Sequence, residues 1–124
     1  MEFFLRVNTQ AGTTSIRLFK DQSSPASFKE FACTVSSGGR DYRSDIPATE
    51  LLEFLAFVGS ANISALGACP MGLDGASYEL TVEEGMAQAT YRWWMTPDER
   101  WRPLQEIASR LLNMGVRISG QYLP

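Results

Sequence analysis

Histidine is absent from the 124 residues. This absence removes the commonest general base, the usual partner of serine and cysteine nucleophiles, and the commonest metal ligand. Lysine is also scarce, since Lys20 and Lys29 are the only two. No catalytic motif appears, so we expect a protein that is not an enzyme and that carries neither a metal site nor a cofactor.

Cysteine is nearly as scarce, with only Cys33 and Cys69. Two thiols do not make the disulfide framework of a small secreted domain. Without histidine they also cannot complete the tetrahedral ligand set of zinc. We favour two buried free thiols, and a bridge between Cys33 and Cys69 or a reactive site remains the alternative.

Long apolar runs are missing as well. No run approaches the roughly 20 residues that span a bilayer. The first residues, Met-Glu-Phe-Phe-Leu-Arg, place an acid where a secretory signal carries bases. We therefore expect a cytoplasmic protein with no membrane partner.

The residues that are present favour one packed domain over 1–124, because 44% of them are hydrophobic. Charge is distributed unevenly around a formal net charge of −3, since Arg92 is the only base between residues 45 and 99. An acidic middle repels nucleic acid and attracts a basic partner, although a simple solvated surface would have the same composition. We expect no nucleic acid partner.

Alternating side chains predict two antiparallel strands at the start of the chain, over Glu2–Asn8 and over residues 13–19. Phe4 and Phe19 fall on the outer side of these strands, which indicates that something covers that end of the sheet. Ser24–Val35 fits either a helix or a strand. We favour a strand over Phe28–Val35, followed by a Gly38-Gly39 hairpin turn and a strand at 40–43.

Two helices are predicted by apolar side chains at helical spacing. The first covers Pro47–Val58 and ends at Gly59, and the second covers Pro103–Met114 and ends at Gly115. Val116–Ile118 would then form a short final strand. Together these elements predict an α+β fold, with an antiparallel sheet of about five strands and two α-helices packed on one face.

A hairpin is predicted over residues 77–94, with Glu84-Gly85 as its two-residue turn. This register places Leu80 opposite Ala89 and Tyr78 opposite Tyr91 on the inner face. The outer face then carries Trp94 next to Arg92, whereas Trp93 points into the core.

An exposed tryptophan beside an arginine has the composition of an interaction hot spot. The alternative is that the 60–76 loop or the N-terminal strands cover Trp94. The candidate partner-binding residues are Glu79, Glu83, Arg92 and Trp94, with Asp98 and Glu99 at the rim.

Leu73–Leu80, followed by Tyr91–Trp94 and a proline-bounded helix, resembles a pattern in small bacterial cytoplasmic α+β proteins, including immunity-type proteins that accompany toxins. The pattern covers about a third of the chain, over residues 73–112, and it contributes no catalytic residues. The resemblance implies a kinship of fold more than of function. Together with the lack of histidine, the acidic middle and the Trp/Arg/Glu face, it leads us to expect an immunity-type inhibitor that neutralises a toxin by occluding its active site, with a basic toxin domain as one candidate partner.

Two other functions stay open at this point. One is a homo-oligomer, such as a homodimer, that pairs through an edge strand at Glu2–Asn8. The other is a small-molecule pocket between sheet and helices, lined by Tyr78, Tyr91 and Trp101.

Overall fold

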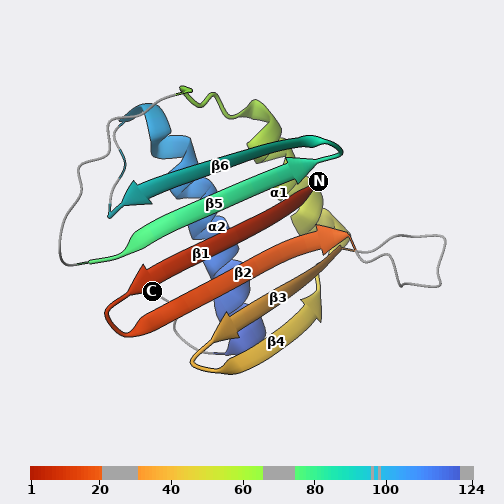
Figure 1. Ribbon diagram of the computed structural model, residues 1–124. Helices are drawn as coiled ribbons and strands as arrows, with labels where there is room; N and C mark the ends of the chain where they lie inside the picture. The colour runs from red at the N-terminus through yellow and green to blue at the C-terminus, as the bar shows by residue number, and fades with distance from the viewer. Residues whose placement is uncertain (21–30, 66–74, 96, 98, 121–124) are drawn as a thin grey trace.

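The structure is a computed structural model that describes residues 1–20, 31–65, 75–95, 97 and 99–120 (Figure 1). Six strands and two helices confirm the predicted α+β fold, with one strand more than expected. In chain order they are β1 (Glu2–Thr9), β2 (Gly12–Lys20), β3 (Phe31–Ser37), β4 (Arg40–Asp45), α1 (Ala48–Ser60), β5 (Ser77–Glu84), β6 (Ala87–Trp94), the 3-10 turn η1 (Glu99–Trp101) and α2 (Arg102–Ser119).

All six strands form one antiparallel sheet in the order β4-β3-β2-β1-β5-β6. The chain makes a meander from β1 to β4, and the β5–β6 hairpin then returns to the free side of β1. β1 therefore lies inside the sheet, and the expectation that Glu2–Asn8 forms an edge is wrong. The edges are β4 and β6.

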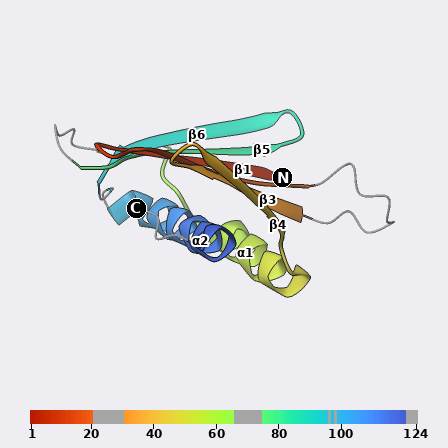
Figure 2. The same cartoon turned by 90° about the horizontal axis from the view of Figure 1, so that it is seen from below.

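Both helices lie on the same face of the sheet, as predicted, and the opposite face is left without a helical layer (Figure 2). α2 packs across β2, β3 and β4. Neither helix is long and apolar enough to cross a membrane among the residues the structure describes. The core lies between the two layers and contains Phe3, Leu5, Val7, Ile16, Leu18, Cys33, Val35, Leu80 and Trp93 from the sheet, and Phe54, Leu104, Ile107, Ala108, Leu111 and Met114 from the helices.

Two tryptophans of the core make both hydrogen bonds and ring contacts. The Trp93 indole N–H donates to Oε1 of Gln105 on α2 at 3.0 Å, and its ring stacks on Tyr78. The Trp101 indole N–H donates to the carbonyl oxygen of Ser64 at 2.9 Å, and Tyr91 meets its ring edge-on. Because each buried indole has an acceptor, neither adds an unpaired polar group to the interior.

The register of the β5–β6 hairpin differs from the prediction. Glu84 pairs with Ala87, so the turn residues are Gly85 and Met86, and Leu80 faces Tyr91. Gly85 has a φ of 60°, and Met86 is not among the residues with positive φ, which is the type II′ pattern with glycine at the first turn position. The resulting shift of two residues leaves every side chain on its predicted face.

The last predicted strand is also wrong, because Val116–Ile118 belongs to α2. The helix passes through buried Gly115 and ends at Ser119, where Gly120 adopts a left-handed conformation with φ 67°. Val116 and Ile118 pack against the core as helical residues, and this burial outweighs the helix-ending tendency of a glycine.

The remaining predictions concern the turns around β3 and α1. Ser37 pairs with Arg40, which confirms the Gly38-Gly39 hairpin. β3 confirms a strand rather than a helix over Phe31–Val35, and residues 24–30 of that prediction lie outside the described residues, as does most of the 60–76 loop. α1 ends at Ser60, one residue beyond Gly59.

Candidate functional site

The sheet face opposite the helices, which we call the open face, is made by the alternate side chains of all six strands. Their positions follow from the strand registers and from the burial of the residues between them. The open face consists of Glu2, Phe4, Arg6 and Asn8 (β1), Thr13, Ser15, Arg17 and Phe19 (β2), Ala32, Thr34 and Ser36 (β3), Asp41, Arg43 and Asp45 (β4), Ser77, Glu79, Thr81 and Glu83 (β5), and Gln88, Thr90, Arg92 and Trp94 (β6).

Arginines cover the two phenylalanines of this face. The Arg17 guanidinium lies 4.6 Å from the Phe19 ring centroid, and that of Arg43 lies 5.4 Å from the same ring. Arg6 lies 5.6 Å from the centroid of Phe4. The cover expected over Phe4 and Phe19 is therefore supplied, at least in part, by arginine side chains of the open face itself. In return, the two rings hold the guanidinium groups in place.

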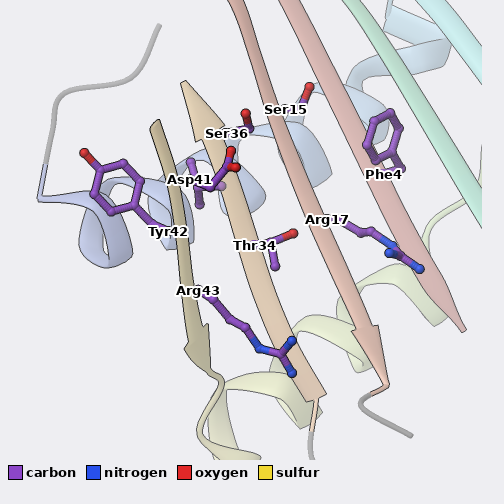
Figure 3. Close-up of a pocket in the computed structure, with 9 residues that line it drawn as sticks. Phe4, Ser15, Arg17, Thr34, Ser36, Asp41, Tyr42 and Arg43 are labelled. Atoms are coloured by element: carbon purple, nitrogen blue, oxygen red, sulfur yellow. The ribbon is translucent and has the colours of Figure 1, made fainter. Parts of the chain in front are cut away.

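Two hollows adjoin at the middle of the open face. One has a volume of about 390 Å³ and is lined from four neighbouring strands, including Ser15, Thr34 and Asp41, as Figure 3 shows. The second has a volume of about 370 Å³ and reaches Thr81 and Glu83 on β5. Phe4 and Arg17 line both hollows.

Four of the six residues predicted as a binding site share the open face. Glu79 pairs directly with Arg92, and a Glu79 carboxylate oxygen lies 2.7 Å from Nε of Arg92. Glu83 lies on the same side of β5. Trp94 emerges opposite buried Trp93, as predicted, and is half-buried.

The two rim residues are a different case. Asp98 lies outside the described residues. Glu99 begins η1, which leads into α2, and its carboxylate lies 3.8 Å from the Arg102 guanidinium. Its described interactions therefore place Glu99 with the helical layer rather than with the open face.

Sequence reasoning missed the basic half of this surface. Arg6, Arg17 and Arg43 join Arg92 on the open face, and they face five carboxylates, so the surface has mixed charge rather than the acidic character expected from residues 45–99. Some of those acids lie elsewhere; Glu50, for example, forms an ion pair with Arg117 of α2. The alternation of β1 and β2 already placed two of the missed side chains, Arg6 and Arg17, outside, which was the available signal.

Cys33 lies in the core between the sheet and the helices rather than on the open face. Burial raises the pKa of the Cys33 thiol to about 11, partly offset by the charge of Arg117, so this free, buried cysteine is protonated at neutral pH and is a poor nucleophile. Among the described ranges, no three of the histidine, cysteine and acidic side chains come together as a metal site.

Comparisons of the chain with known protein families, with curated proteins and with solved structures return no match.

Proposed function

We propose that this chain is a non-enzymatic protein-binding module, most specifically an immunity-type inhibitor that neutralises a bacterial toxin by covering it. The observation that carries the proposal is the open face, a full side of a six-stranded sheet that neither α1 nor α2 covers. Its hollowed centre combines arginine, aromatic and hydroxyl side chains. Arginine and aromatic residues are the side chains most enriched at binding hot spots.

The size of the open face suits a protein partner. Five inter-strand spacings of about 4.8 Å and eight residues of about 3.3 Å give a surface of roughly 24 by 26 Å. Such a patch, with its side-chain relief, approaches the roughly 800 Å² that each partner buries in a standard interface. Because the strands are joined by continuous ladders, the surface is ordered before binding and loses little entropy on contact.

Charge favours a protein over nucleic acid. Five carboxylates lie among the four arginines of the open face, and the whole chain has a net charge of −3. A phosphate backbone would meet as many negative as positive groups there. A basic toxin domain in the cytoplasm would instead be attracted over a distance, so its association rate should fall as salt concentration rises.

The small-molecule alternative receives less support. Tyr78 stacks on Trp93 at a centroid distance of 5.3 Å, and Tyr91 and Trp101 pack on each other at 5.7 Å. These rings fill the space between sheet and helices with one another, so they do not converge on a common ligand.

The test uses the protein encoded beside this chain's gene as the candidate toxin. Co-expression should protect growth, and the purified pair should bind. The double variant Arg17→Ala/Arg43→Ala removes the two guanidinium groups over Phe19 and should weaken binding by at least about tenfold, as expected when hot-spot residues are lost.

The matched control is Arg100→Ala/Arg102→Ala, which makes the same charge change at exposed positions of the helical layer. It should leave the Kd within about twofold, because charges outside an interface contribute little to affinity. Equal loss in both double variants, or unchanged binding in the open-face variant, would contradict the proposal.

A further inference from the structure

The two edges of the sheet are protected very differently. Edge strands usually carry charges that discourage pairing with other chains. β4 follows that rule, since four of its six residues are charged, in the sequence Arg-Asp-Tyr-Arg-Ser-Asp. β6 has eight residues, Ala-Gln-Ala-Thr-Tyr-Arg-Trp-Trp, and Arg92 is its only charge.

The backbone of β6 is free on its outer side at alternate residues. The Met95 N–H donates to the carbonyl oxygen of Ala76 at 2.8 Å, which continues the β5–β6 register and shows that odd-numbered residues face β5. By the alternation of an antiparallel ladder, the N–H and C=O groups of Gln88, Thr90 and Arg92 face outwards. No strand pairs with them among the residues the structure describes.

An apolar hollow of about 310 Å³ lies beside this edge on the helical side. Ala87, Ala89 and Tyr91 form its sheet wall, and Leu104 of α2 and Val58 of α1 are among the residues opposite. Figure 1 shows the start of α2 and the end of α1 extending past β6. The helical layer therefore backs the position that a seventh strand would occupy.

We propose that β6 binds an extended segment of a partner protein as a seventh, antiparallel strand. Residues of that segment opposite Ala87, Ala89 and Tyr91 would be apolar and enter the hollow, and the residues between them would be polar. A second folded copy fits this edge poorly, because its own helical layer would meet the projecting ends of α1 and α2.

Charge sets the direction and ends of the segment. Arg92 is 74% exposed and lies towards the end of β6, whereas Glu83, on the same face of the sheet, pairs with Gln88 near the beginning of β6. An antiparallel segment starts opposite the end of β6, so an acidic residue belongs at its N-terminal end and a basic residue at its C-terminal end.

The probe is a labelled synthetic peptide, acetyl-Glu-Val-Thr-Val-Thr-Val-Lys-amide, with its three valines opposite the hollow. We expect binding to the intact chain with a Kd of roughly 10–100 µM. A peptide of the same composition with Glu and Lys exchanged should bind at least about fivefold more weakly, because like charges then meet at both ends. A peptide N-methylated at its first threonine should not bind.

Two matched variants locate the contact. Thr90→Pro removes an outward N–H without interrupting the β5 ladder and should abolish binding. Asp41→Pro makes the same change at an outward position of β4 and should leave binding unchanged. Circular dichroism and thermal unfolding check that both variants fold.

Hydrogen exchange provides a readout that does not depend on a variant. Saturating peptide should slow exchange at Thr90 and Arg92, whereas Ala89 and Tyr91 are slow from the start. Lack of binding at about 1 mM peptide, equal binding to both charge orders, or equal loss in both proline variants would overturn the proposal. The Arg17/Arg43 experiment changes no residue of β6, so it tests the proposed function separately.

Discussion

Arg17 contacts two neighbours with one planar group. Its guanidinium lies over Phe19, and Nη2 lies 3.3 Å from a carboxylate oxygen of Glu2. Both contacts are partly exposed, so each is weak on its own. Their combined effect is to keep the guanidinium flat against the sheet at the border of both hollows, where a partner would meet it already oriented.

A double-mutant cycle between Arg17 and Phe19 tests this contact. Arg17→Lys keeps the charge but loses the flat stacking group, and Phe19→Leu removes the aromatic face. We expect a coupling free energy of about 0.5–1 kcal/mol from urea unfolding of the four proteins. The same cycle between Arg17 of β2 and Thr90 of β6 should give no coupling, because two other strands lie between them. A coupling free energy near zero between Arg17 and Phe19 would contradict the stacking.

The buried Cys33 thiol makes the free energy of unfolding depend on pH in the alkaline range. Its pKa is about 11 in the folded chain, against an ordinary value of 9.0, because burial disfavours the thiolate. Below pH 9 both states hold the proton. Between pH 9 and 11 the unfolded chain releases it first, so the free energy of unfolding falls by up to about 1.4 kcal/mol per pH unit.

The measurement compares the chain with its Cys33→Ala variant in urea at pH 8 and at pH 11. The variant lacks the titrating thiol, so the stability of the parent relative to it should decrease by about 2 kcal/mol over that range. A constant difference would show that Cys33 is not the buried acid. In the folded chain at pH 8, Cys33 should also resist iodoacetamide.

At the scale of elements, two glycines of the helices have opposite roles. Gly59 lies in the last turn of α1 with open space around its Cβ position, whereas Gly120 closes α2 with a φ of 67°. Gly59→Ala should stabilise the chain by about 0.5 kcal/mol through helix propensity. Gly120→Ala should destabilise it by about 1 kcal/mol through left-handed strain. Thermal unfolding of both variants measures this, and a shift of the same sign would refute the assignment of the two ends.

The elements also show which structural features local sequence patterns can predict and which they cannot. Alternation was enough to predict which faces of β1 and β2 are buried, because the buried inward residues are apolar except for Thr14, whose hydroxyl hydrogen-bonds with that of Ser37. The β5–β6 turn was misplaced because one glycine, Gly85, suits either central position, first in a type II′ turn or second in a type I′ turn. The end of α2 was misplaced because packing of Val116 and Ile118 against the core is not visible in a local pattern.

At the scale of the whole molecule, the strand order could not be predicted from the sequence. β1 pairs with β5, which lies far away in the sequence, and neither strand contains a pattern that identifies its partner. The open face depends on that order, since it joins Arg6 of β1 to Glu79 of β5 in one row. The candidate site was therefore predicted only where it lies within one hairpin, at Glu79, Glu83, Arg92 and Trp94.

The same order predicts a gradient of local stability. Amides of β1 have ladder partners on both sides and should exchange most slowly with deuterium, close to the rate set by global unfolding. Outward amides of β4 and β6 should exchange fastest among the strands. Exchange measured residue by residue by NMR tests this, and a β1 that exchanges as fast as β4 would contradict the central position.

The central position of β1 also bears on synthesis. β1 leaves the ribosome well before β5, and residues 10–76 must be made in between. During that interval the edge of β1 that will later pair with β5 is unpaired in the nascent meander. This edge is available to chaperones or to neighbouring nascent chains. Completion of the sheet then depends on the arrival of one late hairpin, so truncation before residue 77 should yield an insoluble fragment rather than a smaller folded protein.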